Sequence, residues 1–143
     1  MIKLNEIEKE KKEDRVLVSD IFTSKIFKRE SKTINGDYVL KDSKGTGMIN
    51  QILLKSATNT YTIQIIADDN IIYNEPFSFL STNSEHLDNV SAYLAAGVYY
   101  LTIQNLFFQE SFRVRLITSA STVFSLLYIR YAIRNEIIQA IGD

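Results

Sequence analysis

His86 is the first residue to consider for chemistry, because histidine is the usual general acid or base near neutral pH. It is the single histidine of the chain and lies in a polar stretch with Glu85 and Asp88 on either side. This combination could serve a weak metal or acid–base site, but a histidine in a polar loop is more commonly solvated. We interpret His86 as a solvent-exposed loop residue without a catalytic role.

Three other groups contain residue types that are common in metal, nucleotide or catalytic sites, and each has a simpler interpretation. Asp68-Asp69-Asn70 offers oxygen ligands but lacks the spacing of a calcium loop, so we predict a tight turn there. Gly45-Thr46-Gly47 lacks the remaining residues of nucleotide and phosphate motifs, which predicts a flexible connection over residues 41–47. Asp37 and Asp42 could act as a glycosidase pair only if they faced each other, which nothing in the sequence requires. We therefore expect no enzyme, no metal and no cofactor.

Composition excludes further classes of protein. The chain has no cysteine, which excludes disulfide scaffolds, thiolate metal sites and cysteine nucleophiles. Its net charge of −1 provides no field for binding nucleic acid. The longest apolar run, Val123–Ile129, is too short to cross a membrane, and residues 1–15 lack the apolar segment of a secretory signal. We expect a protein made in the cytoplasm that binds neither nucleic acid nor membranes.

Aromatic residues are more numerous than one sandwich core can hold. Rings of this kind serve either as platforms for sugars or as subunit contacts, where tyrosine and phenylalanine are enriched. Tryptophan, the best ring for stacking on sugars, is absent, so we favour subunit contacts and keep a glycan as the alternative. The candidate partner-binding aromatic residues are Tyr99, Tyr100, Phe107, Phe108, Tyr128 and Tyr131.

The charges are crowded toward the amino terminus. Residues 1–45 hold 20 of the 33 charged side chains, which leaves the rest of the chain short of groups that face water. Residues 1–15 form a charged arm whose apolar side chains, besides Met1, are Ile2, Leu4 and Ile7. We expect this arm to bind a neighbouring subunit or another partner, and residues 16–143 to form one domain.

The domain has the two-residue period of β-strands rather than the period of helices. Eight or nine short strands with almost no helix predict an all-β antiparallel sandwich, for which we prefer a jelly roll, with an immunoglobulin-like or fibronectin-like sandwich second. The extended segments are expected at residues 16–21, 26–27, 33–40, 48–55, 60–67, 71–74, 77–80, 98–105, 112–117 and 122–133.

Several local features refine this expectation. Asn35-Gly36 between two apolar runs predicts a hairpin, and residues 48–74 predict a β-meander. Pro76 is expected to open an extended edge segment, followed by a polar loop over residues 81–89. Val123–Ile129 is apolar on both sides of the strand and is therefore expected to be buried on both faces.

Met48, Ile52 and Leu54 are expected to share one face of their strand, and Tyr99 and Tyr100 to point to opposite faces of theirs. Residues 135–141 are expected to form one or two helical turns at most.

Residues 47–56 (GMINQILLKS) and 60–73 (TYTIQIIADDNIIY) resemble the paired strands of small β-sandwich virion proteins of tailed bacteriophages. The resemblance is one of pattern and covers these two segments only. It implies a protein that decorates the head or builds the neck, tail or baseplate of a virion.

Two hypotheses follow from these observations. The first is a non-enzymatic structural virion component, located in the virion, that associates with itself and docks on other virion proteins. The second is a carbohydrate-binding module that attaches to a host glycan. An ordered set of chain copies would favour the first, and a glycan over exposed tyrosines would favour the second.

Overall fold

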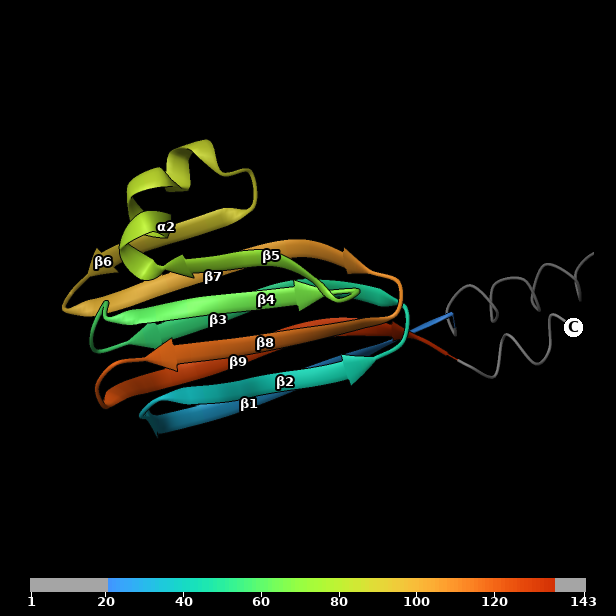
Figure 1. Cartoon of the computed structure of the whole chain (residues 1–143), viewed down its shortest axis with the longest axis horizontal. Coiled ribbons are helices and arrows are strands. Elements are labelled where there is room, and N and C mark those ends of the chain that lie inside the picture. The colour runs from blue at the N-terminus through green and yellow to red at the C-terminus, as the bar shows by residue number, and fades with distance from the viewer. Residues whose placement is uncertain (1–20, 136–143) are drawn as a thin grey trace, which may run out of the picture.

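The structure, a computed structural model, describes residues 21–135 and is a β-sandwich of two antiparallel sheets (Figure 1). The five-stranded sheet has the order β1-β9-β3-β7-β6, and the four-stranded sheet has the order β2-β8-β4-β5. The strands are β1 (Phe22–Ile34), β2 (Asp37–Lys44), β3 (Gly47–Ser56), β4 (Tyr61–Ala67), β5 (Asn70–Pro76), β6 (Val90–Ala95), β7 (Val98–Phe108), β8 (Ser111–Thr118) and β9 (Thr122–Arg134).

The strand pairs are nested, so that strands from the start of the chain pair with strands from its end. β1 pairs with β9, β2 with β8, β3 with β7, and β4 with β5 at the centre. This is the arrangement of one long antiparallel hairpin rolled into two sheets, which is a jelly roll. The predicted fold class is confirmed, and β6 is an additional strand beside β7.

The core lies between the two sheets and is built from the inward side chains of both. In β8, Phe112, Val114 and Leu116 are buried while Arg113 and Arg115 point outward, as the two-residue period of a strand requires. Large side chains from both sheets fill the space, and Tyr61 contacts Phe124 with ring centroids 5.1 Å apart. Burial of these apolar side chains is the main force that holds the two sheets together.

The turn at Asn35-Gly36 was predicted correctly, but the hairpin was not. Gly36 has a φ of +89° and ends the connection from β1 to β2, yet these strands lie in different sheets and pair with β9 and β8. Thr118 holds this turn, because the backbone N–H of Gly36 donates to its hydroxyl at 2.8 Å. The polypeptide therefore crosses between sheets at a place where the sequence favoured two adjacent strands.

Two further expectations about connections are wrong for the same reason. Residues 48–74 are not a meander, because β3 belongs to the five-stranded sheet while β4 and β5 pair with each other in the four-stranded sheet. Residues 41–47 are not a flexible connection, because β2 extends to Lys44 and β3 begins at Gly47. Only Gly45 and Thr46 separate the two strands.

The segment after Pro76 is helical rather than extended. Pro76 ends β5 and precedes α2 (Phe77–Asn83), followed by the short 3-10 helix η1 (Ser84–His86). Proline is well tolerated at the start of a helix, and the three-residue spacing of the buried Phe77 and Leu80 places both on the core side of α2. In Figure 1 these helices lie above β5 and β6, at the opposite edge of the sandwich from β1 and β2.

Irregular positions interrupt the inward–outward alternation of side chains in three strands. Asn50 in β3 is an extra residue relative to β9. Asn105 lies opposite Asn50 in β7 and has a φ of +60°. Ile49, rather than the predicted Met48, therefore shares the buried face of β3 with Ile52 and Leu54. In β9 the extra residue is Ser125. The buried residues of β9 on either side of it are Phe124 and Leu127.

The charged arm at residues 1–15, the strand predicted at residues 16–20 and the helical turns predicted beyond Asn135 lie outside the described residues. Among residues 21–135, no helix is long and apolar enough to cross a membrane.

Candidate functional site

The outer face of the five-stranded sheet carries many apolar side chains, which are divided by one polar row made of Arg130, Gln51 and Gln104. Neighbouring strands place these side chains in rows, such as Ala132, Met48 and Phe107 in one row and Tyr128 and Leu53 in another. We call this surface the apolar face and define it by its outward apolar residues: Ile26, Met48, Leu53, Tyr93, Tyr100, Phe107, Val123, Leu126, Tyr128 and Ala132.

Three of the six predicted partner-binding aromatic residues lie on this face. Tyr100 and Tyr128 are half-buried there, and Phe107 is 74% exposed. The positive φ of Asn105 explains Phe107, because strict alternation from the buried Ile103 would have turned its ring into the core.

The other three predicted aromatic residues belong to the core. Phe108 and Tyr131 are buried and both pack against Phe112, with ring centroids 4.8 and 5.2 Å apart. Tyr99 points inward against Phe77, with centroids 5.4 Å apart. The prediction that Tyr99 and Tyr100 face opposite sides is confirmed, whereas Phe108 and Tyr131 are not accessible to a partner.

Strand β9 is buried on one face only within the described part of the chain. Leu127 and Ile129 have no exposed surface, but Val123 is 46% exposed and Tyr128 is half-buried on the outer side. Among residues 21–135, no segment covers the outer side of this strand, so the expected burial of both faces is not met by the described residues. Burial of the outer side across a subunit boundary stays a prediction.

A hollow of about 440 Å³ lies at one end of the apolar face. Its walls include the exposed rings of Phe22 and Phe107, with Met48 and Ala132 between them. A hollow of this composition accommodates an apolar side chain and offers few hydrogen-bonding groups.

A pair of stacked tyrosines lies at the β6 side of the apolar face. The rings of Tyr93 and Tyr100 are nearly parallel, with centroids 5.1 Å apart and an angle of 13°. The ammonium group of Lys55 lies 5.6 Å from the centroid of the Tyr100 ring. Tyr93 is 49% exposed, so its ring is the accessible member of the pair.

The outer face of the four-stranded sheet carries two ion pairs between β2 and β8. Asp42 pairs with Arg113 at 2.9 Å and Asp37 pairs with Arg115 at 3.8 Å. The strand partners of the two aspartates are four residues apart on β8, which places their backbones about 13 Å apart. Each carboxylate thus pairs with an arginine of β8.

The predicted turn at Asp68-Asp69-Asn70 is confirmed. It also stabilises the fold, which the sequence analysis did not predict. Asp68 and Asp69 both have a positive φ, as this tight turn requires. The Asp68 carboxylate accepts hydrogen bonds from the backbone N–H groups of Gln109, Glu110 and Ser111 at 2.6–3.2 Å. It thereby ties the β4–β5 turn to the β7–β8 turn.

This carboxylate makes stability depend on pH. The N–H of Gln109, followed by that of Glu110, holds the pKa of Asp68 below its usual value of 3.8. The stabilisation is therefore present above pH 3.8 and is lost as the pH falls through the lower pKa of the folded state. We expect Asp68→Asn to lower Tm at pH 7 and the difference from the parent to shrink in acid, measured by thermal unfolding.

Asp69→Asn is the matched control for this experiment, because Asp69 lies in the same turn and accepts none of these three backbone hydrogen bonds. An equal loss of Tm in both variants would contradict the function assigned to Asp68.

The residues first considered for chemistry are exposed or stabilise a turn in the described part of the chain. His86 and its neighbour Glu85 are exposed in η1 and the adjoining turn, and no cluster of three acidic or histidine side chains among the described residues could hold a metal. Burial raises the pKa of Tyr61 far above its usual value, so its hydroxyl stays protonated and is no base. The apolar face is therefore the candidate functional site.

The sequence analysis missed part of this site. Tyr93 and Leu53 were not among the candidate residues, and Tyr93 lies in β6, which was not predicted as a strand. The alternation of Ala92 and Tyr93 between the two faces of an extended segment is the sequence signal from which this strand could have been predicted. Comparison with known proteins adds no assignment, because no protein-family model and no curated protein matches this chain.

Proposed function

We propose that the protein is a non-enzymatic structural component that associates with itself through the apolar face. The observation that carries this proposal is the exposure of Phe107, Ile26 and further apolar side chains on the outer face of one sheet. Exposed apolar side chains gathered on one face indicate an interaction site. The opposite sheet face carries two arginine–aspartate pairs and exposes fewer large apolar side chains, among them Val39 and Ile71.

The contact chemistry of the apolar face fits a protein partner. Aromatic and methionine side chains are enriched at the centres of protein interfaces, while lysine and glutamate are depleted there. Met48, Tyr100 and Tyr128 lie within the face, Glu30 lies at its margin on the edge strand β1, and Lys55 is the lysine between Leu126 and Tyr100. Covering the face with a second copy removes this surface from water, which is the driving force for association.

The proposal places the protein in a virion, where it docks on other virion proteins. The support is the resemblance of residues 47–56 and 60–73 to strands of tailed-bacteriophage virion proteins, together with the jelly-roll fold, which viral capsid domains use. The fold is also used by lectins, so this part of the proposal rests on analogy. The predicted contacts of the arm residues Ile2, Leu4 and Ile7 belong to the same proposal and lie outside the described residues.

Sedimentation velocity of the full chain over a range of concentrations tests the proposal. We expect the parent to associate. Phe107→Ser should weaken the association about tenfold or more, because removing an aromatic ring from an interface commonly costs about 1–2 kcal/mol of binding free energy. Adding Tyr100→Ser should weaken it further.

Ile71→Ser is the matched control, because Ile71 is also highly exposed but lies on the four-stranded sheet. It should associate as the parent does. A parent chain that stays monomeric at all concentrations, or equal effects of Phe107→Ser and Ile71→Ser, would overturn the assignment of the apolar face.

A carbohydrate-binding attachment module is the second candidate, favoured by the stacked pair of Tyr93 and Tyr100. The exposed ring of Tyr93 offers a flat surface of the kind on which sugar rings stack. Screening the parent and Tyr93→Ser on a glycan array distinguishes the candidates. Strong binding to a defined glycan, lost in the variant without a change in oligomeric state, would favour attachment over assembly.

A further inference from the structure

Lysine and arginine side chains are concentrated in one half of the sandwich. Between Lys55 and Arg113 the chain has no lysine or arginine, and this stretch forms β4, β5, α2, η1, β6 and β7. Every lysine and arginine of the described residues except Lys55 is therefore on β1, β2, β8 or β9: Lys25, Lys28, Arg29, Lys32, Lys41, Lys44, Arg113, Arg115, Arg130 and Arg134.

The edge formed by β1 and β2 carries an excess of positive charge, and we call it the basic edge. Its cationic residues are Lys25, Lys28, Arg29, Lys32, Lys41 and Lys44. Glu30 pairs with Lys28 at 3.1 Å, whereas Asp37 and Asp42 are already paired with the arginines of β8. The other five cations of this edge therefore have no acidic partner within 4 Å among the described residues.

Aromatic rings hold several of these cations in place. Arg29 lies 4.9 Å from the centroid of Phe27, Lys32 lies 5.3 Å from Tyr38, and Lys41 lies 5.9 Å from Tyr131. These contacts limit the positions of the charged groups and leave their charge without a counterion from the described chain. The basic edge is thus a partly ordered row of unneutralised cations.

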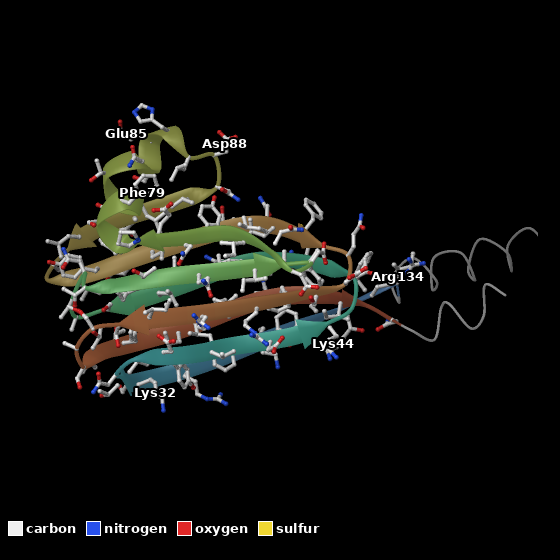
Figure 2. The ribbon with its side chains drawn as sticks, in the orientation of Figure 1. Lys32, Lys44, Phe79, Glu85, Asp88 and Arg134 are labelled. Atoms are coloured by element: carbon white, nitrogen blue, oxygen red, sulfur yellow. The ribbon has the colours of Figure 1, made fainter. Side chains whose placement is uncertain are left out.

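The opposite edge of the sandwich is acidic. Glu75 lies in the edge strand β5, and Glu85 and Asp88 lie in and after η1, with no lysine or arginine nearby in the chain. We call these three residues the acidic edge. Figure 2 shows Glu85 and Asp88 beyond α2, on the far side of the sandwich from Lys32. Phe79, 43% exposed on α2, adds an apolar contact to the same edge.

We propose that the basic edge of one copy docks on the acidic edge of the next copy. This inference rests on the proposed self-association and adds a second contact to it, between different surfaces of the two copies. Charge complementarity identifies the partner, since each copy carries both the cations and the carboxylates that the contact needs. A contact between two different surfaces repeats from copy to copy and produces a ring or a filament.

A second copy fits the charges better than nucleic acid does. A nucleic-acid partner would engage the basic edge but would leave the segregation of Glu75, Glu85 and Asp88 on the opposite edge without a function. The exposed Ile26 on β1 and the exposed Phe79 on α2 also give both edges an apolar group. Association between copies uses both edges at once.

Charge reversal on each edge provides the test, measured by sedimentation velocity of the full chain. We expect Lys25→Glu with Arg29→Glu to weaken association about tenfold or more, and Glu85→Lys with Asp88→Lys to do the same. All four positions are exposed, so the fold tolerates the changes, which circular dichroism will check. Glu110→Lys, in the β7–β8 turn, is the matched control and should associate as the parent does.

Mixing the two reversed chains is the decisive step. In an equimolar mixture, β1 made acidic by Lys25→Glu with Arg29→Glu can contact the η1 region made basic by Glu85→Lys with Asp88→Lys. The mixture should therefore recover the association that each chain alone has lost. The chain with all four substitutions should also associate. Salt should oppose the contact, because the Debye length falls from about 10 Å at 0.1 M to about 3 Å at 1 M.

Each other outcome overturns the inference in a distinguishable way. Reversed chains that associate like the parent, or a mixture that does not recover, exclude the docking of basic on acidic edges while Phe107→Ser still tests the apolar face. Tight, salt-sensitive binding of a labelled DNA duplex by the parent, lost in Lys25→Glu with Arg29→Glu, would assign the basic edge to nucleic acid instead. A monomeric parent excludes both this inference and the proposed function.

Discussion

Replacing Leu127 by aspartate is expected to cost about 4 kcal/mol or more of folding free energy. Leu127 has no exposed surface and lies in β9, which runs between β1 and β3 in the five-stranded sheet. A carboxylate there has no cationic partner in the core, and it must either stay charged at a high desolvation cost or take up a proton. Since domains are stable by roughly 5–15 kcal/mol, urea unfolding should show a severely destabilised protein.

Ser125→Asp is the control for this prediction, because Ser125 lies in the same strand but is the exposed extra residue next to Leu126. It should change stability by no more than about 0.5 kcal/mol. If Leu127→Asp proves too unstable to purify, Leu127→Ala provides the measurement, with an expected loss of about 2–5 kcal/mol. Near-normal unfolding of Leu127→Ala would contradict the placement of β9 in the core.

Replacing Gly47 by alanine is expected to cost about 2–4 kcal/mol for a steric reason. A Cβ atom at Gly47 would lie 1.8 Å from the backbone oxygen of Ala132 and 3.0 Å from the ring of Phe108. The nearest obstacle is backbone, so the overlap cannot be relieved by rotating a side chain. Strands β3 and β9 must separate where Gly47 pairs with Ile133, and Tm should fall accordingly.

Gly97→Ala is the comparison, because a Cβ at Gly97 meets nothing within 4 Å, although its φ is +77°. Its cost should be limited to backbone strain of about 1 kcal/mol. Equal losses for the two variants would mean that the close approach of β9 to Gly47 does not limit stability.

Alternation of side chains was sufficient to predict the regular parts of the fold. Strand β8 and the first half of β7 have unbroken two-residue periods, and the predicted opposite orientation of Tyr99 and Tyr100 is confirmed. The irregular positions Asn50, Asn105 and Ser125 could not be predicted, because a β-bulge leaves no signature in the composition or mean hydropathy of its strand. They decide which side chains beyond them face the core.

The aromatic character of the candidate site could be predicted from the sequence, but the residues that form it could not. An excess of aromatic side chains was evident, yet only the bulge at Asn105 determines that Phe107 faces outward and Phe108 inward. The partners of the strands were also beyond local analysis. Asn35-Gly36 has the composition of a hairpin turn, but tertiary packing directs β1 and β2 into different sheets.

The segregation of charge between two edges could not be read from the sequence for a related reason. The lysines of β1 and the arginines of β9 are far apart in the chain, and they become neighbours only because the first strand pairs with the last. The acidic edge depends in turn on α2 and η1, which were predicted as extended and loop segments.

The pairing of the first described strand with the last has a consequence for synthesis. Contacts such as that between Thr23 and Asn135 join residues 112 positions apart, so the chain has many non-local contacts and should fold slowly. On the ribosome, β1 and β3 must wait for β9, which fills the place between them, before the five-stranded sheet can close. The nascent chain therefore exposes apolar strands that need protection from aggregation until residue 134 has emerged.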